Sequence, residues 1–335
     1  MTPRERVWAA LRGEPVDHPP VSFWGHFYHR ESTAADLVEA TLAFQQRYRW
    51  DWVKLNPRRH YHAEPWGVRY RYSGIRDIKP VLDAWPIHRG EDWARVTERP
   101  HDDGALGEQL EAVRLLRRAL PEDVPMVQTV FTPLAILREM VSGPEDLKQH
   151  LESHPTLVRS ALNAVTETFT DYVRAVLAAG ADGIYLATVD WASRDLMTVE
   201  QYRTWARPWD EALLQAAEGA PFNVLHVCRR NNLLFDLGDY RVAAFSWAAT
   251  EPSNPSLGEA LGKLSGAVMG GIGHEGSLQQ PEAGPALAEL QDGFDQTGGR
   301  RWLAAPGCSI PPSTRPEHLE KLRGAIEHMH SARER

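Results

Sequence analysis

Eight short apolar runs are the feature of this sequence that most restricts its fold. Each run is about as long as one β-strand, and most are apolar throughout rather than alternating apolar with polar residues. Such runs are typical of parallel strands that are buried on both faces. They occupy residues 19–24, 51–56, 124–130, 182–188, 222–227, 242–247, 266–272 and 301–306.

Segments with helical periodicity separate most of these runs, and the alternation predicts parallel βαβ units with right-handed crossovers. Eight such units most simply close into a (β/α)8 TIM barrel. A doubly wound sheet is the second choice, but it would want a glycine-rich turn after its first strand, and "VSFWGHFYHRE" has one glycine. The predicted helices cover 32–48, 104–120, 142–181 (divided near Pro155), 198–219, 255–264, 281–299 and 315–331.

The domain organisation follows from length and from the absence of breaks. A chain of 335 residues fits one barrel. It contains neither an internal repeat nor a low-complexity linker, so we expect a single domain over residues 1–335. The segment 57–103 is long for a connection, and "YHAEPWGVRYRYSGIRDIKPVL" predicts a hairpin-like excursion within it.

Charge and composition exclude several classes of partner. The net charge of −8 argues against binding to nucleic acid or to an anionic membrane surface. The short basic cluster "PRRH" (57–60) is interpreted as solvated surface. No apolar run reaches the length of a membrane span, the N-terminus lacks a signal core, and two cysteines make no disulfide framework. We therefore expect a cytoplasmic protein, monomeric or homodimeric.

The two cysteines of the chain both follow predicted strands. His226 and Cys228 stand at the end of the fifth run, where residues i and i+2 point the same way. Cys308 lies just beyond the eighth run, and barrel active sites sit at the carboxyl ends of the strands. One imidazole and two thiolates suit Zn²⁺ and leave a fourth position open, as in catalytic zinc sites. The alternative is that both cysteines serve packing alone.

A wider set of motifs resembles the uroporphyrinogen decarboxylase superfamily. The motifs are "RERVWAALRGEPVDHPP" near the start, "GADGIYLATVD" (180–190), "NVLHVC" (223–228), "VMGGI" (268–272) and "LAAPGCSIPPSTRPEHL" (303–319). The chain is most similar to the branch of zinc-dependent, corrinoid-linked methyltransferases. In that branch H-x-C and a distant G-C bind zinc, and zinc activates a thiol to accept a methyl group from a methylated corrinoid protein. The resemblance implies that His226, Cys228 and Cys308 are the ligands.

The same resemblance implies the partners. They are a small thiol or methylated substrate and a separate corrinoid protein, because the chain has no corrinoid domain of its own. Two arginines, Arg229 and Arg230, follow H-x-C where the methyltransferases commonly have glycine. They are interpreted either as contacts for a carboxylate or phosphate or as a solvated helix start.

Two departures argue against uroporphyrinogen decarboxylation itself. The decarboxylases carry R-Q-A-G-R after the first strand, where this chain reads "FWGHFYHRE". They also carry an aspartate at the end of the second strand, where this chain has Asn56. A substrate with eight carboxylates needs fixed cations, so we expect a different reaction.

Further candidate site residues stand at other predicted strand ends. Asp190 is a candidate catalytic base, a helix cap or a partner of His226, and His274 is a second catalytic candidate or a surface histidine in a turn. The candidate substrate contacts are Trp24, His26, Asn56, Thr129, Tyr185, Arg229, Ser246 and Trp247.

Three functions compete on these residues, beside the weak fourth of uroporphyrinogen decarboxylation. The first is a zinc-dependent methyltransferase acting on a thiol. The second uses zinc-bound water to cleave an S-, N- or O-linked small molecule, as a hydrolase or lyase. The third is a carrier or sensor with a saturated metal site.

Overall fold

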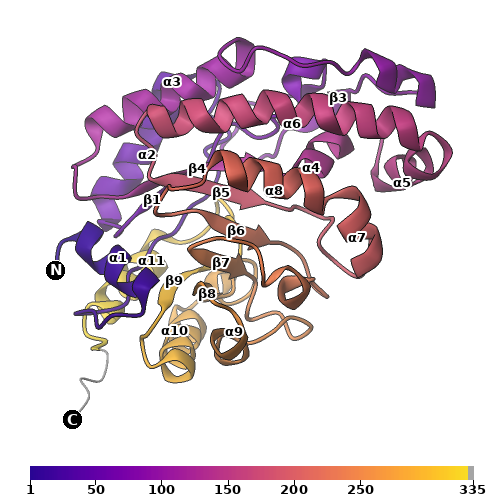
Figure 1. Cartoon of the computed structure of the whole chain (residues 1–335). Helices are drawn as coiled ribbons and strands as arrows, with labels where there is room; N and C mark the ends of the chain where they lie inside the picture. The colour runs from indigo at the N-terminus through magenta and orange to yellow at the C-terminus, as the bar shows by residue number, and fades with distance from the viewer. Residues whose placement is uncertain (331–335) are drawn as a thin grey trace.

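Seven parallel strands form one curled sheet in the order β1-β4-β5-β6-β7-β8-β9 (Figure 1). The structure, a computed structural model, describes residues 1–330. Every strand pairs with its neighbour in parallel, and the strand residues are buried almost throughout. The strands are β1 (Val53–Leu55), β4 (Met126–Phe131), β5 (Gly183–Ala187), β6 (Val224–Val227), β7 (Ala244–Trp247), β8 (Ala267–Ile272) and β9 (Trp302–Pro306).

Residues 19–24 close the sheet into a barrel by lying between β9 and β1. Val21 forms an isolated parallel bridge with Ala304, and the amide of Ala304 donates to the carbonyl of Pro20 at 2.9 Å. On the other side, the amide of Asp51 donates to the carbonyl of Val21 at 3.0 Å. The two prolines that begin this segment have no N–H to donate, so it pairs only briefly. The predicted TIM barrel is confirmed, and each predicted apolar run contributes one segment of its wall.

Helices cover the outside of the sheet and match most of the predicted ones (Figure 1). Within residues 1–330 no helix is both long and apolar enough to cross a membrane. Residue 331 of the last predicted helix lies outside the described residues. The matching helices are α2 (Ala34–Tyr48), α3 (Gly104–Ala119), α5 (Pro144–Ser153), α6 (Pro155–Ala178), α9 (Leu257–Lys263), α10 (Gly284–Thr297) and α11 (Pro316–Ile326). Two short 3₁₀ turns, η3 (Leu234–Leu237) and η4 (Ser277–Gln279), lie outside the predicted helices.

The helical structure differs from the prediction in three places. The segment 198–219 forms two helices, α7 (Val199–Trp205) and α8 (Arg207–Ala216), because Pro208 cannot continue a helix but suits the first turn of a new one. Two helices were not predicted, α1 (Pro3–Arg12) and α4 (Pro133–Glu139). Helix α1 packs on the core inside the barrel, with the Trp8 ring 5.8 Å from the ring of Phe222. It therefore closes the end of the barrel where the strands begin.

The segment 57–103 contains a hairpin and two short 3₁₀ turns. Strand β2 (Arg69–Arg71) pairs antiparallel with β3 (Val81–Ala84), between η1 (Glu64–Trp66) and η2 (Gly90–Arg95). The buried indole of Trp66 donates to the carbonyl of Thr97 at 2.8 Å within the segment. The hydroxyl of Tyr61 donates to the carbonyl of Thr129 on β4 at 2.9 Å, which helps fix the segment on the barrel. The chain entering the hairpin thereby becomes one wall of the cavity described next.

Candidate metal centre

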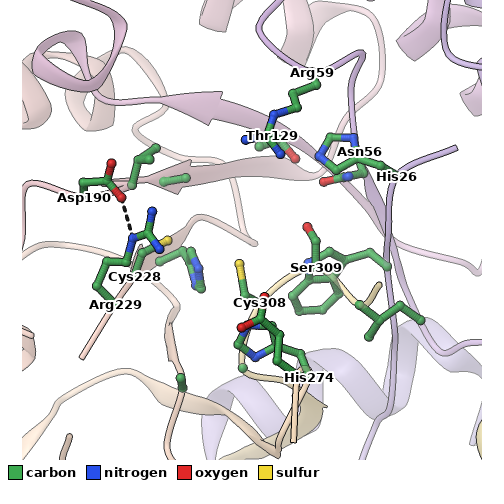
Figure 2. A pocket seen from close by; sticks show the side chains of 18 of the residues that line it. His26, Asn56, Arg59, Thr129, Asp190, Cys228, Arg229, His274, Cys308 and Ser309 are labelled. Atoms are coloured by element: carbon green, nitrogen blue, oxygen red, sulfur yellow. Dashed lines mark hydrogen bonds and ion pairs between the residues drawn. The ribbon is translucent and has the colours of Figure 1, made fainter. Parts of the chain in front are cut away.

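A cavity of about 850 Å³ opens at the carboxyl ends of the strands (Figure 2). Its volume is within the range of small-molecule sites. Segments that follow most of the strands contribute to its lining. The predicted site residues among those that line it are Trp24, His26, Asn56, Thr129, Tyr185, Asp190, His226, Cys228, Arg229, His274 and Cys308.

His226, Cys228 and Cys308 converge at this cavity. One ligand atom from each lies within 4.8 Å of the other two. The Nε2 atom of His226 is buried and has no hydrogen-bond partner within the part of the chain that the structure describes. Tetrahedral zinc, at about 2.3 Å from sulfur and 2.0–2.1 Å from nitrogen, would place such atoms roughly 3.6–3.8 Å apart. The three residues therefore fit a zinc ion if their ligand atoms approach one another by at most about 1 Å.

The orientation of the His226 imidazole is set from behind by strands β5 and β7. Its Nδ1 atom hydrogen-bonds the hydroxyl of Ser246 at 3.1 Å, and that hydroxyl lies 3.0 Å from the hydroxyl of Tyr185. With the proton on Nδ1 donated to Ser246, the lone pair of Nε2 faces the sulfurs. Ser246 is fully buried and contacts the histidine rather than the cavity.

Gly307 explains why glycine precedes the second cysteine. A Cβ atom at position 307 would lie 2.8 Å from the Cα of Ala248, so the chain can approach the end of β7 only without a side chain there. The amide of Gly307 donates to the carbonyl of Ile272 at 2.9 Å. Two residues beyond Cys308, the amide of Ile310 donates to the carbonyl of Trp24 at 2.8 Å. These bonds hold the Cys308 loop between β8 and the closing segment.

The two thiols act as one titrating pair. A hydrogen bond from Cys228 to Cys308 lowers the pKa of Cys308 and raises the pKa of Cys228. Burial opposes ionisation of both sulfurs, whereas His226 and His274 favour it at Cys308. The hydrogen bond thus favours the proton on Cys228, and a metal ion would displace this proton.

Lys54 lies beside this centre and was missed by the sequence reasoning. It sits on β1 with only 5% of its surface exposed, and it lines the cavity. Its ammonium donates to Asn56 Oδ1 at 2.5 Å and lies 4.7 Å from the centre of the Tyr185 ring. Burial lowers the pKa of Lys54 to about 7, although thiolate charge on Cys308 and Cys228 acts in the opposite direction. A lysine inside the apolar run "DWVKLN" was the signal that could have identified it.

The opposite wall of the cavity is built from residues 57–62 and helix α4. Nε of Arg59 donates to Nε2 of His60 at 2.6 Å, and Nδ1 of His60 lies 3.3 Å from Glu139. Burial lowers the pKa of His60 to about 4, so His60 is neutral near pH 7. Figure 2 shows Arg59 across the cavity from the sulfurs. The interpretation of 57–60 as solvated surface was wrong, because these residues are buried or half-buried in the cavity wall.

Asp190 and Arg229 form an ion pair at the rim of the cavity, with Nε and Oδ1 2.5 Å apart (dashed line in Figure 2). The carboxylate predicted as a base is therefore engaged with a cation. Arg230 pairs likewise with Asp195 at 2.9 Å. Arg229 has a left-handed φ of 69°, so the segment after Cys228 bends instead of starting a helix.

The remaining predicted residues take three different positions. His26 hydrogen-bonds the buried Glu31 at 3.0 Å, and Thr129 donates to the carbonyl of Leu55. His274 lies close to Cys308 in Figure 2 and acts on it electrostatically. Trp247, predicted as a substrate contact, is fully buried outside the cavity lining, and its indole donates to the carbonyl of Pro255.

Comparison with known proteins identifies the family. The family description uroporphyrinogen decarboxylase (URO-D) matches residues 2–329. The chain belongs to this family. Family members are not uniform in activity, as the relatives of this chain illustrate.

Two relatives and one solved structure represent the similarity. The methylcobamide:CoM methyltransferase MtaA of Methanosarcina barkeri is 25% identical, over 97% of each chain. The uroporphyrinogen decarboxylase of Xanthomonas axonopodis pv. citri (strain 306) is 26% identical, over 98% of this chain and 99% of its own. A methyltransferase from Methanosarcina mazei superposes with a TM-score of 0.80 at 22% identity over 98% of each chain, which confirms the fold. Because the relatives include both activities, the residues of the site have to distinguish between them.

Proposed function

We propose that this member of the URO-D family is a zinc-dependent methyltransferase. In this proposal a small thiol accepts a methyl group from a methylated corrinoid held by a separate protein. The observation that carries the proposal is the convergence of two sulfurs and an unpartnered imidazole nitrogen within 4.8 Å at the cavity. The similarity to the methylcobamide:CoM methyltransferase MtaA supports it.

His226 Nε2 and the sulfurs of Cys228 and Cys308 would hold the zinc ion. When bound there, zinc keeps an acceptor sulfur ionised at neutral pH, and the thiolate is the nucleophilic form of a thiol. Three protein ligands leave a position for that sulfur. Two protein thiolates and a neutral imidazole balance the charge of a divalent ion, so an acceptor sulfur would remain electron-rich.

The surrounding residues would orient the reactants. Ser246 and Tyr185 fix the imidazole from behind, and the aromatic faces of Trp24 and Tyr185 line the cavity next to Lys54. A wall that fixes the acceptor sulfur opposite the methyl carbon lowers the entropic part of the barrier. The methyl donor would approach through the open mouth, because the cavity is formed at the surface end of the barrel.

Besides Lys54, Arg59 and Lys79, the cations that line the cavity are not free to bind a substrate with eight carboxylates. Arg229 and Arg230 are already paired with Asp190 and Asp195. The end of β1 carries the amide of Asn56 where the decarboxylases have an acid. Zinc-bound-water chemistry, the second hypothesis from the sequence, needs a base, and its candidate Asp190 is held by Arg229.

The test is methyl transfer from methylcobalamin to 2-mercaptoethanol and to 2-mercaptoethanesulfonate, followed by mass spectrometry of the thioether. The purified protein is assayed zinc-loaded, stripped by chelation and reloaded. We expect about one zinc per chain and a thioether that forms only in the loaded samples. A protein that binds no zinc, or a stripped sample as active as the loaded one, contradicts the proposal.

A further inference from the structure

Lys54 is a buried cation without a carboxylate partner in the described part of the chain. Its one hydrogen bond goes to the neutral amide oxygen of Asn56, and its other neighbours are the rings of Tyr185 and Trp24. Burying an unpaired ammonium costs several kcal/mol, so a chain that keeps one usually uses it. The negative groups that act on Lys54 are Cys308 and Cys228. Lys54 therefore lines the same cavity as the candidate metal centre and carries the charge opposite to that of its thiolates.

The charge of the centre changes when an acceptor sulfur binds. Two thiolates and an imidazole neutralise a divalent ion, and a third thiolate adds one negative charge in a buried site. A thiol that enters at neutral pH also brings a proton with it, because its pKa lies above 8. The site thus needs both a positive charge and an acceptor for one proton.

Several titratable groups of the cavity are poorly suited to accept that proton, and His274, which also lines the cavity, is tested separately below. Asp190 is held in its ion pair with Arg229. Burial lowers the pKa of His60 to about 4 and the pKa of His62 to about 3, so both are weak bases. Glu139 is a weaker base still. Burial acts to raise the pKa of its carboxyl group, but the hydrogen bond from His60 brings this pKa down to about 2. Tyr185 is already hydrogen-bonded to Ser246.

We propose that Lys54 accepts the proton of the acceptor thiol and stays in place as the counter-charge of the resulting thiolate. In this step the S–H bond breaks and its electron pair remains on sulfur, while the lone pair of neutral Lys54 Nζ forms the new N–H bond. The ammonium so formed faces the added negative charge. Once the sulfur carries the methyl group it is neutral, and Lys54 can release the proton through the open cavity. This inference rests on the proposed function, since it requires a thiol in the site.

A fall of the Lys54 pKa to about 7 makes the proposal measurable, since the side chain is then largely neutral at pH 8 and charged at pH 6. The experiment titrates 2-mercaptoethanol into zinc-loaded protein by calorimetry, in buffers of different ionisation enthalpy, and counts the protons released. The wild type should release about one proton at pH 6 and close to none at pH 8.

Two variants separate the proton from the charge. Lys54→Arg keeps a permanent cation that cannot accept a proton, so it should bind the thiol well but release about one proton at both pH values. Lys54→Met removes both functions, so it should also release about one proton and bind the thiol at least tenfold more weakly. Zinc content and melting temperature, measured on each variant, verify that the site and the fold are intact.

His274 is the competing candidate for the proton acceptor, because it lies near Cys308 and also lines the cavity. We expect His274→Gln to release the same number of protons as the wild type. If His274→Gln changes the count and the Lys54 variants do not, His274 is the acceptor and the proposal is wrong. Equal counts in all four proteins also overturn it.

A second thiol, 2-mercaptoethanesulfonate, distinguishes proton acceptance from recognition of an anionic tail. If Lys54→Met weakens only the sulfonate and leaves 2-mercaptoethanol unaffected, Lys54 binds a substrate tail and the proposal fails. If neither thiol binds zinc-loaded wild type, the proposed function fails with it. If the thiols bind but the Lys54 variants release as many protons as the wild type, the role of Lys54 is contradicted and the proposed function is not.

Discussion

The segment around β1 carries one buried charge toward each end of the barrel, and only one of the two charges is neutralised by ion pairs. At the lower end, where the strands begin, the fully buried Asp51 pairs with Arg6 at 2.5 Å and with Arg323 at 2.9 Å. Three residues later Lys54, almost as deeply buried, has no ion pair in the described residues. The lower network joins α1 and α11 to Asp51, two residues before β1, so its charges stabilise the fold. The unpaired lysine lies toward the upper end, where the strands finish and where barrel enzymes place their active sites.

The strongest test at the upper end removes a metal ligand. Cys308→Ala leaves two of three ligands, and we expect zinc content and methyl transfer to fall more than about 100-fold, beyond what loss of a supporting residue costs. Melting of the metal-free protein should change little. Metal analysis and product mass spectrometry measure the effect, with the neighbouring Ser309→Ala as control. Full zinc content in Cys308→Ala would show that Cys308 is not a zinc ligand.

The matching test at the lower end removes the shared carboxylate. Asp51→Ala leaves Arg6 and Arg323 short of a partner, and we expect the free energy of unfolding to fall by about 3–5 kcal/mol. Zinc binding by the folded fraction should persist. Urea denaturation provides the measurement, with Asp77→Ala as an exposed control that changes stability by less than about 0.5 kcal/mol. A loss below about 1 kcal/mol for Asp51→Ala would refute a stabilising role of the network.

Replacing Lys54 should raise the free energy of unfolding, whereas replacing Asp51 should lower it. The unfolded lysine has a pKa of about 10.4, and the folded one about 7, so protonation favours the unfolded state. The cost of burial is therefore greatest below pH 7 and diminishes as the pH rises toward 10. We expect Lys54→Met to stabilise the metal-free protein by roughly a few kcal/mol at pH 6 and by less at pH 9.

Urea denaturation at the two pH values measures this difference, and Lys321→Met, at an exposed position, is the control. A destabilised Lys54→Met protein would mean that the lysine supports the fold, as Asp51 does, and the contrast between the two ends would be lost.

The smallest expected effect comes from behind the histidine. Ser246→Ala removes the hydroxyl that orients His226, and we expect zinc affinity to fall about 10–100-fold while the fold persists. Competition with a chelator measures the affinity. Tyr185→Phe, which removes the next hydroxyl, should lose less. An unchanged affinity in Ser246→Ala would show that packing alone orients the imidazole.

The sequence was informative where position along a strand decides position in space. His226 lies near the end of β6, Cys228 directly follows it and Cys308 follows β9, and closure of a barrel is enough to bring such ends together. It was uninformative where packing decides. Residues 57–60 were interpreted as a solvated basic cluster because their inward path depends on how the excursion packs Trp66 and Trp93 against the helices. Glu139 lies on a helix that was not predicted, so its pairing with His60 could not be anticipated.

The brief pairing of residues 19–24 also affects the chemistry. This seam is the least regular join in the barrel wall, and the loop that bears Cys308 is fastened to it through Ile310 and Trp24. An ion shared between that loop and β6 would act as a brace across the lumen. If the pairing of residues 19–24 loosened, the sulfur of Cys308 would therefore move before the rest of the barrel did. The metal occupancy of the site would then indicate how tightly the barrel is closed.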